Sequence, residues 1–318
     1  MKNRVIKLLK LLPVISICTI TCIAFEVTNG QYPAQDSTGI KQAVSMNNPL
    51  QNGRPSPDTS IKIIIRGDDI GFSNAANLGC IKAYNEGILT TTEVMATCPW
   101  FLDAANLLRE NPGLDVGVHL TLTSEWDNYK WGPITNAPSL VTEDGYFPVS
   151  NNGFLQLDYS LEEVELELRA QIELALKYIP QISHLSIHMG APTATPALNR
   201  IVQDLSEEYN LPVSPVGVRQ WYGMWAVAAD QKEDYLANLL RNLQPGLYVL
   251  VCHPALNNQE SQAIKGSGHD ASERMAVHRG IVTNALTSDR IKQIIEERQI
   301  QLVSYSDTFA PDDPNDMI

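Results

Sequence analysis

The chain has 318 residues, of which 44% are hydrophobic and 19% are charged. These proportions are ordinary for a globular protein and allow a sizeable buried core. The formal net charge of −13 argues against nucleic acid or an anionic membrane surface as the main partner.

Residues 1–30 have the order of a secretory signal peptide. The basic start MKNRVIKLLK is followed by the apolar stretch LLPVISICTITCIAF and then by polar residues. A retained membrane anchor is the alternative, but the apolar run is short and contains Ser16, Thr19 and Thr21. We therefore expect export to the periplasm or the extracellular space, with no membrane attachment once the signal is removed.

Residues 31–59 are polar and rich in Pro, Gly and Asn, which indicates a flexible lead-in. One folded domain is expected over residues 60–310, followed by a polar tail at 311–318. The cysteines left in the domain are too few to form a disulfide framework, so the fold must depend on its hydrophobic core.

From residue 61 onward, short β-type runs alternate with helical patterns. The expected strands cover residues 61–67, 88–98, 115–122, 182–188, 211–218, 247–253 and 301–305. The expected helices cover residues 74–87, 101–111, 160–179, 196–210, 230–243 and 288–300. Helix 160–179 has the strongest amphipathic pattern. Its apolar stripe consists of Leu161, Val164, Leu168, Ile172, Ala175 and Ile179.

Alternating units of this length predict an α/β protein with parallel strands and crossover helices. About seven such units indicate a single (β/α) barrel that is closed or nearly closed. An open doubly wound sheet is the alternative. No glycine-rich nucleotide-binding motif follows any of the runs.

Four of the apolar runs deliver Asp or His side chains where the run ends. These side chains are Asp68 and Asp69, then His119, His188 and His253. In (β/α) barrels the carboxyl ends of the strands meet on one face, where reactive groups lie. A single histidine in a strand is more often a core residue, and Asp69 could cap the next helix, although Ser73 is better placed. Independent structural roles would not be expected to place all of these side chains on the same face, so their occurrence together favours a functional site.

One carboxylate and two imidazoles leave open positions on a divalent cation, and both Mg²⁺ and Zn²⁺ are compatible with such a set. His184 and His188 are about 13 Å apart on an extended strand, so they cannot bind the same ion. We take His188, at the strand exit, as the ligand and His184 as a supporting residue hydrogen-bonded nearby. The second carboxylate of the Asp68–Asp69 pair can then act as a base on water.

The segments that carry these residues resemble the YdjC-like carbohydrate deacetylases, which include chitooligosaccharide deacetylases. The matching segments are DDIGFSNAANLGCIKAYNEGILTTTEVM, GVHLTLT, SHLSIH and VCHPA. The resemblance covers about residues 61–305. It implies a distorted TIM-like barrel that uses a divalent metal to remove the acetyl group from an N-acetylated saccharide.

The resemblance also implies a role for each residue. The implied metal ligands are Asp69, His119 and His188, the base is Asp68, and the proton donor to the leaving amine is His253. The third motif of the family reads H-x-D-x-H-x-H, whereas this chain has Ser186 in place of the Asp and Gly190 in place of the last His. This departure leaves the substrate more open than the reaction class.

Three further residues are candidates for contact with the substrate. Trp126 and Trp131 lie in the long loop 123–158, where aromatic faces could hold a sugar ring or simply pack on the barrel rim. WYGMW at 221–225 has the same two interpretations. Arg274 could bind an acidic sugar, although a solvated helix charge is the simpler interpretation, as it is for Arg279.

Two other functions compete with deacetylation. A phosphoesterase-like metallohydrolase would be expected to have more Lys or Arg near the site. A glycosidase needs two separated carboxylates, which the adjacent pair does not provide. A non-catalytic glycan-binding barrel would not need Asp68 beside a full set of ligands.

Overall fold

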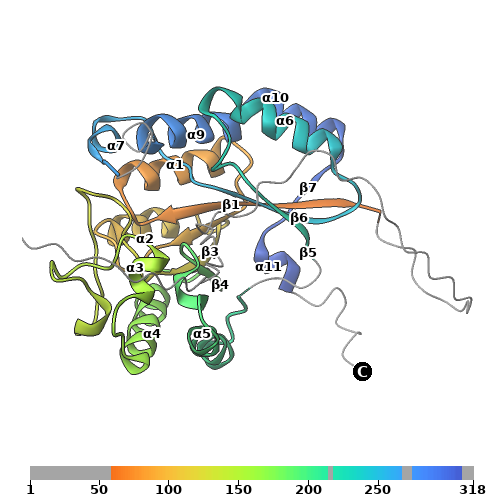
Figure 1. Ribbon diagram of the computed structural model, residues 1–318. Coiled ribbons are helices and arrows are strands. Elements are labelled where there is room, and N and C mark those ends of the chain that lie inside the picture. Colours follow the sequence, from red (N-terminus) through yellow and green to blue (C-terminus); the bar gives the residue numbers. More distant parts are fainter. Residues whose placement is uncertain (1–58, 214–217, 267–273, 310–318) are drawn as a thin grey trace, which may run out of the picture. The chain divides into compact units, whose positions relative to one another are not determined.

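Seven parallel strands form the sheet at the centre of the domain (Figure 1). Their order is β4-β3-β2-β1-β6-β5, and β7 pairs with the start of β1. The strands are β1 (Ile61–Ile70), β2 (Thr91–Val94), β3 (Asp115–Leu120), β4 (Ile182–Ile187), β5 (Val218–Gly223), β6 (Gly246–Cys252) and β7 (Gln301–Leu302).

Helices follow most of the strands. They are α1 (Asn74–Asn85), α2 (Phe101–Glu110), α3 (Asn151–Leu155), α4 (Leu161–Tyr178), α5 (Pro196–Tyr209), α6 (Lys232–Asn242), α7 (Gln259–Ala263), α9 (Arg279–Thr287), α10 (Asp289–Glu297) and α11 (Tyr305–Phe309). A π-helical turn, Arg274–His278, leads into α9. Figure 1 shows α1, α6, α9 and α10 on one side of the sheet and α4 and α5 on the other.

The computed structural model describes residues 59–213, 218–266 and 274–309. The predicted signal peptide, nearly all of the lead-in and the polar tail lie outside the described residues and stay predictions. Among the described helices, none combines the length and the apolar character needed to cross a bilayer.

The parallel strands and crossover helices confirm the predicted α/β barrel, and the number of strands agrees with the prediction. The barrel is distorted, because no strand pairing joins β4 to β5 within the described residues. Strand β1 lies in the middle of the sheet, where Ile63, Ile64 and Ile65 are fully buried. A continuous apolar run is expected for a parallel strand that is covered on both faces.

Three local predictions were wrong. The strand predicted at 211–218 has different bounds: residues 211–213 are not in a strand, residues 214–217 lie outside the described residues, and β5 covers Val218–Gly223. Pro212 has no N–H to donate to a strand ladder. The last strand ends at Leu302, because Ser304 caps α11: its Oγ accepts from the Asp307 N–H, and the Asp307 carboxylate accepts from the Ser304 N–H. The Asp115 carboxylate also accepts hydrogen bonds from the backbone N–H of Tyr305 and Ser306. Leu161, in the first turn of α4, is 44% exposed, although the rest of the predicted stripe is buried.

Candidate metal centre

The end of β1 carries a bulge that turns both aspartates toward β3. Neighbouring residues on a strand normally point to opposite faces. Asp69, however, has a left-handed backbone with φ of 74°, and the register with β2 shifts between Asp68 and Ile70. His119 Nε2 is consequently 3.6 Å from Asp68 Oδ2 and also 3.6 Å from Asp69 Oδ1. Bulges of this kind re-aim side chains next to active sites.

The structure brings Asp69, His119 and His188 together in a buried cluster. One ligand atom from each residue lies within 4.8 Å of the others, and His188 Nδ1 is 3.4 Å from Asp69 Oδ1. These separations resemble the spacing of about 3.4 Å between ligand atoms that are each about 2.0–2.1 Å from a tetrahedral cation. Asp69 Oδ1 is buried and has no hydrogen-bond partner, so the donor set suits a cation.

Arg279 holds the other oxygen of Asp69. Its Nη2 is 2.8 Å from Asp69 Oδ2, and its guanidinium lies over the rings of Phe72 and Trp126. The interpretation of Arg279 as a solvated helix charge was therefore wrong, since the residue is only 2% exposed. Burial alone would raise the pKa of Asp69, but Arg279 and His188 outweigh it and hold that pKa well below its usual range.

Asp68 is the second carboxylate of the bulge, and Arg66 binds both of its oxygens. Arg66 Nε donates to Oδ1 at 2.6 Å and Nη2 donates to Oδ2 at 2.9 Å. Burial, assisted by the nearby Glu93 and Asp69 carboxylates, raises the pKa of Asp68 to about 7, while Arg66 acts in the opposite direction. Asp68 can therefore exchange a proton near neutral pH.

The two histidines of the cluster have different partners. His119 Nδ1 is 2.8 Å from Ser186 Oγ, and burial, together with His188 and Arg66, holds the pKa of His119 well below its usual range. His188 Nε2 is 3.1 Å from Glu125 Oε2. Burial disfavours its charged form, but Glu125 and Asp69 prevail and raise the pKa of His188 to about 10. Glu125 and Asp69 therefore favour a positive charge at this end of the cluster.

His253 follows β6 on the other side of β1. Because Gly67 pairs with Cys252, the next residue, His253, is level with Asp68. Its ring is 5.3 Å from that of Trp225, centroid to centroid, at an angle of 62°. Burial lowers the pKa of His253 to about 3, with Arg279 adding to the effect and Asp69 opposing it, so the ring is neutral at physiological pH.

The other residues predicted for the site are His184, the two tryptophans of the loop and Arg274. His184 is buried behind the cluster, with Nε2 2.9 Å from Glu93 Oε1. Trp126 and Trp131 pack around Phe72 and are only 4% and 3% exposed, so neither offers an open face to a sugar. The Arg274 side chain lies outside the described part, and its role stays a prediction.

Sequence reasoning missed Arg66, Glu93 and Glu125. Arg66 and Glu93 lie inside buried strands, and a charged residue in an otherwise apolar strand is a signal that could have identified them. Glu125 has no such signal, since it lies in a polar loop.

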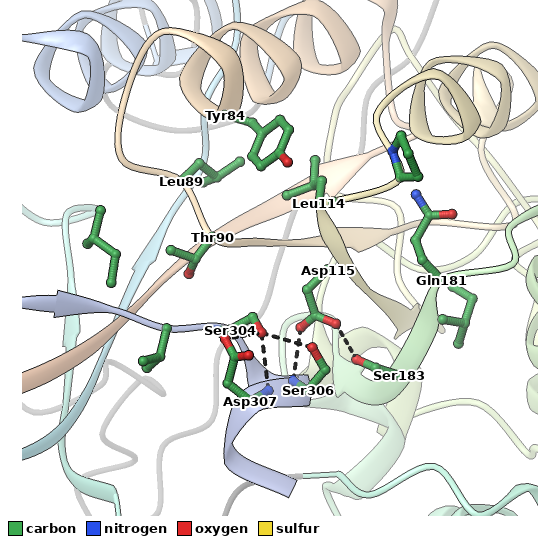
Figure 2. Close-up of a pocket in the computed structure, with 15 residues that line it drawn as sticks. Tyr84, Leu89, Thr90, Leu114, Asp115, Gln181, Ser183, Ser304, Ser306 and Asp307 are labelled. Carbon is green, nitrogen blue, oxygen red and sulfur yellow. Dashed lines mark hydrogen bonds between the residues drawn. The ribbon is translucent and has the colours of Figure 1, made fainter. Parts of the chain in front are cut away.

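A cavity of about 510 Å³ lies at the opposite ends of the strands (Figure 2). Asp115 and Ser183, at the starts of β3 and β4, form part of its wall, and their side chains are hydrogen-bonded at 2.6 Å. None of the metal-cluster residues lines this cavity. It is therefore separate from the candidate metal centre.

Comparison with known proteins places the chain in a family. The model of the YdjC-like protein family matches residues 62–297. The chain is 28% identical to carbohydrate deacetylase 2 of Listeria innocua serovar 6a, covering 78% of this chain and 98% of the relative. It is 33% identical to the carbohydrate deacetylase of Halalkalibacterium halodurans, covering 61% of this chain and 85% of the relative.

A solved structure agrees with the sequence comparisons. An Enterococcus faecalis V583 protein, whose proposed role is cellobiose-phosphate cleavage, superposes with a TM-score of 0.65 at 28% identity. The match covers 78% of this chain and 99% of that protein. The family match extends from the start of β1 to the end of α10 and includes every residue of the candidate metal centre. The chain therefore belongs to the YdjC-like family.

Proposed function

We propose that this protein is a metal-dependent hydrolase that removes the N-acetyl group from an amino sugar or its oligosaccharide. The reaction class is that of the relatives, which are carbohydrate deacetylases and match over nearly their whole length. The observation that carries the metal dependence is the buried Asp69 Oδ1, which accepts no hydrogen bond and faces two imidazole nitrogens beside Asp68.

Asp69, His119 and His188 would hold one divalent cation. Imidazole nitrogens suit Zn²⁺, whereas Mg²⁺ prefers oxygen ligands, so the donor set favours Zn²⁺. The cation would supply Lewis acidity, which polarises a carbonyl oxygen and eases the deprotonation of water.

The residues around the cation would handle the protons. Asp68, whose ionised form is favoured by its two hydrogen bonds from Arg66, accepts the proton of the water that attacks the acetamide carbon. The C–N bond then breaks, which yields acetate and an amine. His253, level with Asp68, donates a proton to the leaving nitrogen. Because its ring starts neutral, His253 must first receive the proton that Asp68 has taken from the water, and it then passes this proton to the leaving nitrogen, which restores both groups to their starting forms.

A screen of N-acetylated mono- and oligosaccharides for released acetate tests this function. We expect acetate release that stops with a chelator and returns with added Zn²⁺. Phosphate release from sugar phosphates, with no acetate, would instead support a phosphoesterase. That rival has less support, because Arg66 and Arg279 direct their guanidinium groups to Asp68 and Asp69. Saccharide binding without any hydrolysis would contradict an enzymatic role.

Trp225 is the best placed aromatic residue for contact with the sugar. It follows β5, is 47% exposed and touches the ring of His253. The backbone beside it is fixed, because Lys232 Nζ donates to the Met224 carbonyl at 2.5 Å. An exposed indole next to the proton donor suits the apolar face of the pyranose that carries the leaving nitrogen.

Replacing Trp225 with alanine is expected to raise KM by about 2- to 10-fold, as the loss of an aromatic contact of 0.5–1.5 kcal/mol implies. The value of kcat should change less, because the indole contacts the sugar and not the acetyl group. Trp225→Phe keeps an aromatic face and serves as the matched control. Steady-state kinetics on an acetylated oligosaccharide measure both parameters, and an unchanged KM in Trp225→Ala would exclude this contact.

A further inference from the structure

Glu93 lies behind the metal centre and is not explained by the mechanism above. It belongs to the short strand β2 and is completely buried. Its Oε2 accepts a hydrogen bond from Ser186 Oγ at 2.6 Å. Its Oε1 is 2.9 Å from His184 Nε2 and 3.3 Å from Arg66 Nε. Glu93 therefore contacts Ser186, which is hydrogen-bonded to the proposed metal ligand His119. It also contacts Arg66, which is hydrogen-bonded to the proposed base Asp68.

The hydrogen bonds of Ser186 determine the tautomer of His119. A serine hydroxyl has a single proton, and Ser186 gives it to the Glu93 carboxylate. At 2.8 Å from the same oxygen, His119 Nδ1 must then be the donor. The lone pair of His119 is consequently on Nε2, the nitrogen that faces Asp68 and Asp69. This is the tautomer that can bind a cation at that position.

The surrounding structure is built to accept the Glu93 carboxylate. A buried carboxylate is costly unless it is paired and hydrogen-bonded. Arg66 and His184 provide cationic or donor partners on one oxygen, and Ser186 provides a donor on the other. Gly117 on the neighbouring strand leaves the necessary space, since a Cβ there would collide with the Glu93 carboxylate and the His184 ring.

We propose that Glu93 is a positioning residue for the metal centre, acting on His119 through Ser186 and on Asp68 through Arg66. The inference rests on the proposed metal site. The Glu93 carboxylate on β2 reaches across β3 to Ser186 on β4, and the Ser186 hydroxyl connects it to His119.

The test measures the affinity of the purified protein for Zn²⁺ by competition with a chromophoric chelator. Glu93→Gln and Ser186→Ala are each expected to weaken binding by about 10- to 100-fold, the usual effect of losing a partner of a ligating histidine. Adding Ser186→Asp to Glu93→Gln should restore much of the affinity, because the new carboxylate can accept directly from His119 Nδ1. Glu167→Gln is the matched control, since Glu167 is an equally buried carboxylate that binds backbone N–H groups of the loop at Ile134 and Thr135.

Each possible result of these affinity measurements supports or contradicts the proposed role of Glu93. If Glu93→Gln does not fold, Ser186→Ala still decides, because it leaves the contacts of Glu93 with His184 and Arg66 in place. Wild-type affinity in Ser186→Ala would overturn the proposal, as would a double variant as weak as Glu93→Gln alone. A wild-type protein that binds no Zn²⁺ would instead refute the metal site itself. Acetate release, measured separately, would show whether the proposed function fails independently of Glu93.

Discussion

Chelation of the wild-type protein and the substitution His119→Ala are each expected to reduce acetate release by a factor on the order of 10³. This factor corresponds to the several kcal/mol of transition-state stabilisation that a catalytic cation supplies. His119 is the informative ligand to remove, because its depressed pKa keeps it neutral and its loss leaves no unpaired buried charge. Removing Asp69 would instead leave the buried Arg279 without its carboxylate partner.

Adding metal back distinguishes the chelated wild-type protein from the variant His119→Ala. Added Zn²⁺ should return activity to the chelated wild type but not to His119→Ala, in which one of the three ligands is missing. The control is chelator already saturated with Zn²⁺, which should have no effect. Circular dichroism checks that the fold persists. Full acetate release from protein shown by mass spectrometry to be metal-free would contradict metal-dependent catalysis.

Asp68→Asn is expected to lower kcat by about 10²–10⁴-fold, the usual contribution of a general base. An amide cannot take the proton of the attacking water, whereas its size and shape match those of the carboxylate. The affinity for Zn²⁺ should change little, because Asp68 is not one of the three clustered ligands. Kinetics combined with the chelator competition assay measure both effects, and wild-type kcat in this variant would exclude Asp68 as the base.

The role of Asp68 also has a pH signature. As a base it works ionised, so kcat/KM should fall as the pH drops through its pKa. That pKa is about 7 in the metal-free protein, and a bound cation lowers it, so the acid limb is expected below pH 7. Arg66→Met should move the limb to higher pH, because Arg66 favours the ionised form. A limb at the same pH in both proteins would contradict this assignment.

The fold was largely predictable because local pattern carries it. The apolar run of β1 and the amphipathic stripe of α4 both appear at the expected places. Prediction failed where a local pattern competed with a tertiary contact. Residues near 301–305 contain the local cap formed by Ser304 and Asp307, but nothing there indicates that the distant Asp115 also holds the first N–H groups of α11.

The sequence by itself determined that Asp68, Asp69, His119, His188 and His253 end parallel strands and so belong to one face of the barrel. This follows because parallel strands bring their carboxyl ends together whatever their order in the sheet.

Only the tertiary structure decided which charges meet. The bulge at Asp69 turns its carboxylate toward His119 and His188, and the register of strands distant in sequence places Glu93 beside Ser186. Burial, likewise, removed Trp126 and Trp131 as open sugar-binding faces and left Trp225 exposed. Such pairings depend on offsets between strands and on close packing, and a periodic pattern in one segment contains neither.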